Sequence, residues 1–426
     1  MITYLVYRSL ITEPAGLLFE TGLFLTISCG VYYAFGPLLF VVGPLDAAEY
    51  SKSWYPINAS ESVWLTGLNY IGFGLAGLVY VFTKLQSLAR IAGTAAFHWG
   101  RIRPERLFIG FLLLGVVAKY LFVLPFELRL TEHVPAGAIR QASRLLAVAL
   151  LVGWAYRKVG PWWMGPATKL LLLSEVVTGF LMFNKSEVLI AAMASALGYY
   201  FSCGQLRKLV HAAILGFVIY VLINPIATFG RDELAHRGGG VPAAAGLIER
   251  FKIVGSYFAG TESHFRRPEI SGTWWSRLNY LPPQNAAIQL YRQGQGSDDF
   301  ERLGWVLVPR LLFPDKPMMT GAGIDLTEKI TGLRNSSTGI GIFVDGYYML
   351  GWLGVVLASF SYGLALRAYS VVARSIVQDH AVAMYPLVFM GIYVGLRADG
   401  MWLTDVAGPL IFMLVILGGF RLAARR

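Results

Sequence analysis

A rigid, charged segment runs from Trp305 to Pro317, with the sequence WVLVPRLLFPDKP. Arg310 interrupts an apolar run, and Asp315 and Lys316 follow between two prolines. Proline restricts its own backbone and that of the residue before it, so these charges are held at nearly fixed positions. A guanidinium beside an ammonium suits phosphate, because one donates paired hydrogen bonds and the other adds point charge. The pattern predicts phosphate ligands at Arg310 and Lys316, with Asp315 and Trp305 in support. The same cations could instead bind lipid headgroups or pair with Asp315.

Three more arginines are candidate ligands for the same anion. Arg231 directly follows an apolar segment, where it either faces a cavity or reaches the membrane surface as an interfacial side chain. Arg277 lies in WWSRLNYLPP, whose aromatic residues either hold a sugar phosphate or form an interfacial belt. Arg397 lies near Asp399, and the two form a simple ion pair or belong to the same cavity.

One carboxylate has the position expected of a general base. Asp345, in FVDGYYMLGWLG, opens an apolar segment close to the charged motif. A carboxylate at the membrane edge can accept the proton of a sugar hydroxyl. The alternative is an acid that merely favours a helix N-terminus. We take Asp345 as the candidate catalytic residue and Tyr347 as a supporting one.

Two charges interrupt apolar segments, and no pattern indicates a metal. Lys119 and Glu175 lie inside predicted spans, where charge is costly and indicates either function or pairing across helices. His236 and His264 have no partner at zinc-ligand spacing, so no metal site is predicted.

The composition defines the class of protein that must position these residues. Of 426 residues, 56% are hydrophobic and 14% charged, whereas soluble domains carry about 25% charged residues. The net charge of +11 is spread over short loops between apolar segments, which argues against a nucleic-acid partner. The composition therefore predicts a polytopic membrane protein rather than a large soluble enzyme.

The apolar segments predict an all-α protein of about ten transmembrane helices, since a span needs about 20 apolar residues. The predicted spans are 17–42, 64–83, 107–126, 142–156, 167–183, 186–202, 209–229, 346–366, 382–397 and 405–422. The fourth, sixth and ninth are short. This spacing divides the chain into an N-terminal bundle at 1–229, a large loop at 230–345 and a C-terminal bundle at 346–426.

The distribution of basic residues predicts the orientation. With the N-terminus in the cytoplasm, sixteen Lys and Arg fall on the cytoplasmic side and six in the short loops opposite. This bias places both termini in the cytoplasm and the large loop outside. Within that loop, apolar residues recur at helical spacing between 247 and 258, which predicts a helix lying in the membrane interface.

A family resemblance rests on residues 305–354. The motif VPRLLFPDKP, the stretch 336–339 rich in Ser, Thr and Gly, and the Asp345-x-Tyr347 pattern with glycines at 351 and 354 occur in this order. Together with many spans and one large outer loop, they resemble bacterial O-antigen and exopolysaccharide repeat-unit polymerases of the Wzy type. Arg310 and Gly321 also keep an arginine–glycine spacing of eleven found in some members.

The resemblance implies a membrane-embedded glycosyltransferase of the bacterial inner membrane, with its large loop in the periplasm. The donor would be a glycan on undecaprenyl pyrophosphate and the acceptor a lipid-linked repeat unit, with no cofactor. A chain-length-regulating co-polymerase is a further candidate partner, beside membrane lipid. Cations would stabilise the charge of the leaving pyrophosphate.

Two alternatives remain open from the sequence. A ligase, such as an O-antigen ligase, would transfer finished glycan to another acceptor by the same chemistry. A lipid-linked oligosaccharide transporter would use the intramembrane charges instead, although transporters commonly show two related halves and the predicted spans are unequally divided around the loop.

Overall fold

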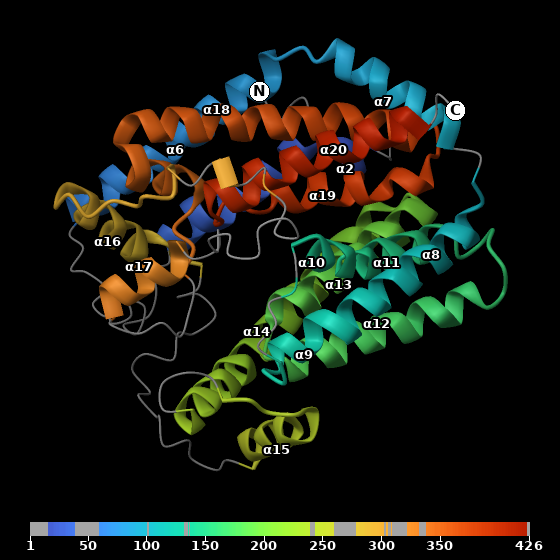
Figure 1. Cartoon of the computed structure of the whole chain (residues 1–426), viewed down its shortest axis with the longest axis horizontal. Coiled ribbons are helices and arrows are strands. Elements are labelled where there is room, and N and C mark those ends of the chain that lie inside the picture. The colour runs from blue at the N-terminus through green and yellow to red at the C-terminus, as the bar shows by residue number, and fades with distance from the viewer. Residues whose placement is uncertain are drawn as a thin grey trace. The chain divides into compact units, whose positions relative to one another are not determined.

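The computed structural model in Figure 1 consists of helices joined by turns and loops. It describes residues 16–38, 59–99, 102–131, 135, 137–238, 243–259, 278–301, 304–305, 308, 322–331 and 338–423. No strand occurs in these ranges. The prediction of an all-α polytopic membrane protein is confirmed.

Among the described residues, eight helices are long and apolar enough to cross a membrane. They are Thr21–Leu38, Ser60–Phe82, Pro104–Glu127, Met164–Leu181, Lys185–Cys203, Arg207–Arg231, Ile342–Gln378 and Leu403–Leu422. The count differs from the predicted ten because two predicted spans form shorter helices. The segment 142–156 contains the end of α10 (Gly137–Ser143) and then α11 (Leu145–Ala155), and 382–397 contains the apolar helix Val382–Gly395.

Packing divides the chain into two compact units that do not follow the order of the sequence. Unit 1 joins residues 1–100 to 275–426, and unit 2 holds 101–274. The predicted boundaries at 229 and 345 follow the chain, whereas the first helices pack against the last ones. In unit 1 the central helix is α18 (Ile342–Gln378), which contacts α6 (Ala59–Phe82), α7 (Gln86–Trp99) and α19 (Tyr385–Gly395).

Helix α18 consists of two arms joined by a sharp turn. Leu350 and Gly351 leave helical geometry, and Gly351 has a φ of 60°. Gly346 and Gly354 would lie about 12 Å apart along a straight helix. Instead, a Cβ on either glycine would overlap the carbonyl of the other. The short arm, 342–349, is therefore folded back against the long arm, as the bent orange helix in Figure 1 shows.

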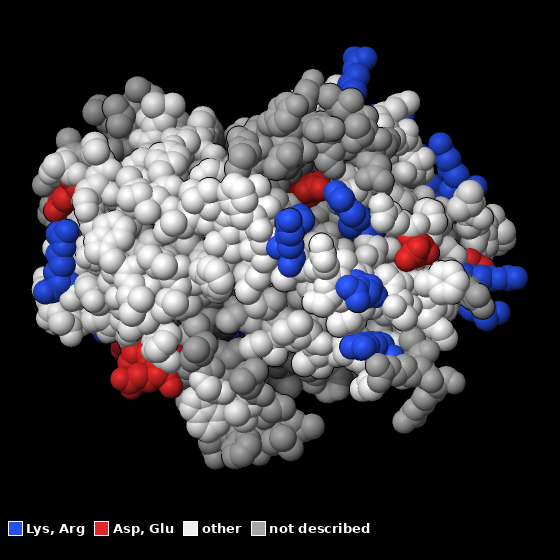
Figure 2. Space-filling view, turned by 90° about the horizontal axis from the view of Figure 1, so that it is seen from above, with Lys and Arg blue, Asp and Glu red and all other residues white. Residues whose placement is uncertain are grey.

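The two ends of unit 1 differ in chemistry. Along the long arm of α18, Arg367 donates to the carbonyl of Thr83, and Arg374 pairs with Glu20 at 2.9 Å. Aromatic and acidic residues surround the turn at the other end, near Gly351. From Gly351 to Arg374 a helix rises about 35 Å, close to the thickness of a bilayer core. On the face drawn in Figure 2, Lys and Arg gather toward one side, next to a broad area without charged side chains.

Unit 2 is built around α11, in which residues 146–153 are all buried. It packs between α8 (Pro104–Val116), α12 (Met164–Leu181) and α13 (Lys185–Cys203). The chain then continues through the 32-residue α14 (Leu206–Arg237). Lys119 and Glu175 pair across helices at 2.9 Å, which is one of the two predicted alternatives, and Glu187 contacts the same ammonium at 2.6 Å.

The amphipathic segment 247–258 forms the helix α15 (Leu247–Phe258), as predicted. Its side chains fall into three stripes. Arg250, Ile253 and Val254 are buried, Leu247, Ile248, Phe251 and Phe258 are exposed, and Glu249, Lys252 and Ser256 form a polar stripe between them. A helix with an exposed apolar stripe beside a polar one suits the interface between lipid and water.

Candidate functional site

Asp345 lies in the short arm of α18 and has no exposed surface. Its Oδ2 accepts a hydrogen bond from the backbone N–H of Trp402 at 2.8 Å. Its Oδ1 has no hydrogen-bond partner among the described residues. The described charged groups that act on it most strongly are Asp299 and Asp405, which are both acidic. Asp345 is therefore a buried carboxylate with a free oxygen and without a compensating cation in the described part of the chain.

Local geometry explains how this carboxylate is placed. Gly341 precedes the short arm with a φ of 84°, a conformation that favours glycine, and its carbonyl accepts from the Asp345 N–H. The N–H of Ile342 donates to the carbonyl of Ala398. The paired Gly346 and Gly354 let the two arms approach closely, as small residues do between membrane helices. Together these features press Asp345 against the segment that follows α19.

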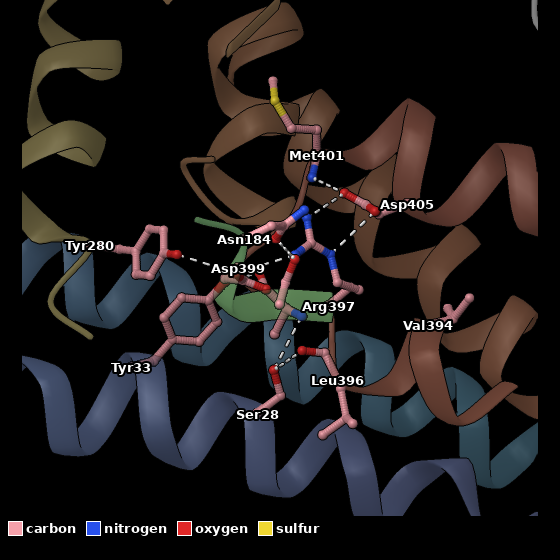
Figure 3. A network of polar contacts seen from close by, with 12 residues as sticks. Ser28, Tyr33, Asn184, Tyr280, Val394, Leu396, Arg397, Asp399, Met401 and Asp405 are labelled. Atoms are coloured by element: carbon pink, nitrogen blue, oxygen red, sulfur yellow. Dashed lines mark hydrogen bonds and ion pairs between the residues drawn. The ribbon is translucent and has the colours of Figure 1, made fainter. Parts of the chain in front are cut away.

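That segment, residues 396–401, is a break between α19 and the π-helical turn η5 (Leu403–Ala407). Figure 3 shows Arg397 between two carboxylates in this break. Its guanidinium contacts Asp405 through Nε and Nη2, both at 3.2 Å, and Asp399 through Nη1 at 3.6 Å. The Met401 N–H also donates to Asp405. The ion pair predicted as one reading of Arg397 and Asp399 is present, and Asp405 extends it.

Groups from distant parts of the chain hold the break in place (Figure 3). Tyr280 donates to Asp399 at 3.1 Å, and Tyr33 donates to the carbonyl of Ala398. Burial raises the pKa of Asp399 above its usual range, although Arg397 opposes that change. Asp399 and then Asp405 hold the pKa of Arg397 above its ordinary value. Arg397 is thus already neutralised by two carboxylates, a setting better suited to fixing the break than to holding a diphosphate alone.

An aromatic cluster surrounds the turn at Gly351. It consists of Trp64 from α6, Tyr291 from α16 (Leu281–Arg292), and Tyr347 and Trp352 from the two arms of α18. The ring of Tyr347 lies 5.2–5.9 Å from the other three. A Cβ at residue 351 would lie 2.7 Å from the Tyr291 hydroxyl, so the turn requires glycine for space as well as for backbone conformation.

An open pocket of about 510 Å³ lies beside the short arm. It is lined by Gly296, Ser297, Asp298, Asp325, Glu328, Lys329 and Tyr348. Lys329 donates to the Tyr348 hydroxyl and to the carbonyl of Gln295, each at 3.2 Å. Tyr348 also follows Asp345 by three residues, so one arm of α18 contributes to both features. Carboxylates accept hydrogen bonds from hydroxyl groups, and aromatic rings offer flat apolar surfaces.

The predicted site residues are only partly covered by the structure. Arg277, Arg310, Asp315 and Lys316 lie outside the described residues. Trp305 is half-buried, and Tyr347 is buried in the aromatic cluster. Arg231 is exposed on α14 in unit 2, where its Nε donates to the Ala227 carbonyl. Within unit 1, Arg397 lies near the start of the break at 396–401. Asp345 accepts a hydrogen bond from Trp402, which directly follows the end of that break.

Sequence reasoning missed several residues of this region. Asp405 opens a predicted span, so the cost of a carboxylate in lipid was a signal that could have marked it. Arg292 and Trp64 are 228 residues apart in the sequence, and no spacing rule joins them. The pocket residues come from three separate segments, which no local pattern connects.

The fold and the polar interior define an all-α membrane protein with a buried carboxylate at a helix break. No protein-family profile, curated protein or solved structure matches the chain. The resemblance to Wzy-type polymerases accordingly stays a prediction from residues 305–354.

Proposed function

We propose that this protein is a glycosyltransferase that polymerises lipid-linked oligosaccharide repeat units at the outer face of the bacterial inner membrane. The observation that carries the proposal is Asp345, a buried carboxylate that keeps one oxygen without a partner among the described residues. Its neighbours supply surfaces that suit a glycan, namely the aromatic cluster and the acidic pocket. The motif 305–317 adds cations of the kind that a pyrophosphate leaving group requires.

In the proposed reaction, a hydroxyl oxygen of the acceptor sugar attacks the anomeric carbon of the donor glycan. The bond from that carbon to the pyrophosphate oxygen breaks, and the lipid pyrophosphate leaves with the electron pair. Asp345 accepts the hydroxyl proton as the new glycosidic bond forms. Attack from the side opposite the leaving group inverts the anomeric centre.

The positions of the charges indicate a different role for each group of residues. The described residues near Asp345 are mainly acidic, which suits proton acceptance and sugar hydroxyls but not an anion. Arg310 and Lys316 therefore stay the leading ligands for pyrophosphate, and Arg277 and Arg231 are further candidates. Arg397 is assigned to positioning, because its contacts with Asp399 and Asp405 hold the break against which Asp345 is fixed.

Access to Asp345 requires movement. The carboxylate has no exposed surface, so an acceptor hydroxyl reaches it only when neighbouring side chains shift. Tyr348 both lines the pocket and precedes the turn at 350–351, which makes the short arm the natural moving part.

The orientation is proposed from charge. The predicted cytoplasmic bias of Lys and Arg agrees with the basic end of unit 1 at Arg367 and Arg374. The turn of α18, with its aromatic and acidic surroundings, would then lie toward the periplasm. The donor lipid would approach laterally from the membrane, and a co-polymerase that sets chain length stays a candidate partner.

The decisive experiment incubates purified protein with a lipid-linked repeat unit and separates the products by size. A ladder of products supports the polymerase. A single transfer to a second acceptor supports the ligase, and the absence of any product rejects both.

Arg310→Ala should stop chain lengthening while the protein still inserts. Normal chain length in that variant would reject the role of Arg310 in binding the pyrophosphate. If Asp345→Asn retains full activity, Asp299 and Glu301 are the next candidate bases, together with Glu262 outside the described residues.

Two helix breaks inside unit 1 favour a second candidate, a transporter of lipid-linked oligosaccharide. Transporters bind substrates at discontinuous helices. In unit 1, α18 is interrupted at 350–351, and the segment 396–401, which holds Arg397 and Asp399, interrupts the helices α19 and η5. Movement of a labelled lipid-linked oligosaccharide across a proteoliposome membrane, without any change in its size, would support this alternative.

A further inference from the structure

Arg292 is the last residue of α16 and is exposed. Its guanidinium carbon lies 5.3 Å from the centre of the Trp64 ring. Within the described ranges, no carboxylate lies at ion-pair distance from it. Arg397, by comparison, is held by two carboxylates. Arg292 therefore presents a charge that is oriented by an aromatic ring and is available to an anion.

The apolar surface beside this arginine continues along one helix. The ring centres of Trp64 and Trp352 lie 6.1 Å apart in an edge-to-face arrangement, and Trp352 is 46% exposed. Val356 and Phe360 follow at intervals of four residues and are 49% and 54% exposed. Residues at this spacing lie on one face of a helix. The exposed stripe formed by Trp352, Leu353, Val356 and Phe360 extends about 12 Å along α18.

An arginine above this stripe has the form of an amphipathic site. Tryptophan marks the boundary between hydrocarbon and headgroups, and Trp64 and Trp352 both lie at the end of unit 1 away from Arg367 and Arg374. The stripe suits a hydrocarbon chain within the bilayer. Arginine binds phosphate oxygens in pairs and keeps its charge at every physiological pH.

We propose that Arg292 and the stripe bind the lipid-diphosphate part of the donor, with the diphosphate on the guanidinium and the prenyl chain along α18. The assignment rests on the proposed function, because that function supplies a prenyl diphosphate carrier. It places the lipid beside the aromatic cluster, where a glycan attached to the diphosphate reaches the partly exposed ring of Tyr291. The site adds a cation to the set that the sequence motif indicates.

Farnesyl diphosphate serves as the probe, because it carries the same two groups without a sugar. Its equilibrium binding is measured on the purified full-length protein in detergent, with inorganic pyrophosphate and phosphatidylglycerol as competitors. Arg292→Gln should weaken binding of farnesyl diphosphate about tenfold or more, as loss of a charge-assisted hydrogen bond does. Arg292→Lys should recover part of the affinity, since a point charge remains without the paired geometry.

A matched arginine provides the control. Arg157 in unit 2 also stacks on a tryptophan, with its guanidinium carbon 5.6 Å from the Trp154 ring, but it is held by Tyr199 as well. Arg157→Gln should leave the affinity for farnesyl diphosphate unchanged. Equal losses in the two variants, or no loss in Arg292→Gln, would overturn the assignment.

The stripe is tested separately. Phe360→Ser should weaken binding of farnesyl diphosphate but not of inorganic pyrophosphate, whereas Val415→Ser, at a residue 67% exposed on α20 (Gly408–Ala423), should change neither. Equal competition by phosphatidylglycerol would identify a general anionic-lipid contact and reject a donor site.

These outcomes are independent of the glycosyl transfer itself. Arg292-dependent binding in a protein that yields no glycan product would reject the proposed function and leave the lipid site standing. A normal product ladder from Arg292→Gln would reject the lipid site and leave the function standing.

Discussion

The two units place buried charge in opposite ways. In unit 2, Lys119 contacts Glu175 and Glu187 directly. Glu127 lies within electrostatic range of Lys119 and of two arginines, Arg140 and Arg250. The group contains three cations and three carboxylates, and its charges cancel. In unit 1, Arg397 is the one described cation in direct contact with Asp399 and Asp405, while the described charges acting on Asp345 are acidic.

This difference separates structural charge from candidate functional charge. A buried ion is tolerated when a partner of opposite sign lies close by, so a balanced group needs no further ligand. The charged group of unit 2 is then explained as a connection between α12, α13 and the π-helical turn η2 (Val117–Val123), which carries Lys119. An acidic excess in unit 1 costs stability, and catalytic sites commonly accept such a cost.

The largest effect should come from the carboxylate without a cation. Asp345→Asn keeps the size of the side chain and removes the proton acceptor, so polymerisation should fall about 100-fold or more. The yield of the product ladder from a lipid-linked repeat unit measures this. Glu175→Gln is the matched change in unit 2 and should retain activity in the protein that remains folded. Equal losses of activity in both variants would contradict the assignment of functional charge to unit 1 and structural charge to unit 2.

The second effect is on stability and should appear in unit 2. Lys119→Met leaves Glu175 without its cation in a buried site, and breaking such a pair costs about 3–5 kcal/mol. Thermal unfolding in detergent measures the loss. Replacing both partners, as in Lys119→Met with Glu175→Leu, should recover much of it, because no unpaired charge remains at that pair. Failure of the double variant to recover would show that the network does more than balance charge.

The third effect tests the fold of α18. Gly354→Ala places a methyl group against the carbonyl of Gly346, and overpacking of this kind costs about 1–3 kcal/mol. Activity should fall as well, because the short arm carries Asp345. Gly67→Ala on α6 is the control, since a Cβ there meets nothing within 4 Å. Unchanged unfolding and activity in Gly354→Ala would contradict the close packing of the two arms.

Local patterns predicted much of this architecture. Apolar length gave most of the spans, and helical spacing gave α15 with its stripes. The pairing of Lys119 with Glu175 was one of two interpretations that followed from the cost of charge in lipid. Arg397 and Asp399 were correctly expected to meet as one of two readings, because they lie two residues apart.

Long-range geometry was not accessible from the same patterns. Gly351 lies in the run GWLG, which has the composition of an uninterrupted membrane helix, so the fold-back at 350–351 leaves no local signal. The contact between Asp345 and Trp402 joins residues 57 apart in sequence. Helix–helix packing decides both, and a single sequence specifies packing only through many weak preferences. Arg310 and Lys316 lie outside the described residues, and their roles stay predictions.

The smallest effect should be a pH dependence in the break between α19 and η5. Burial raises the pKa of Asp399 in the folded protein above its unfolded value. A carboxyl group of this kind contributes stability that is complete below the unfolded pKa and is lost as the pH rises through the folded pKa. Asp399→Asn cannot ionise, so it should gain stability relative to the unmodified protein as the pH rises from about 4, by no more than about 1 kcal/mol. Unfolding midpoints measured across this pH range test the expectation.

Asp405→Asn is the comparison, because it breaks the contacts with Arg397 and Met401 and should destabilise the protein at every pH in this range. If Asp399→Asn instead loses stability relative to the unmodified protein as the pH rises, Asp399 is held by its ion pair rather than strained by burial.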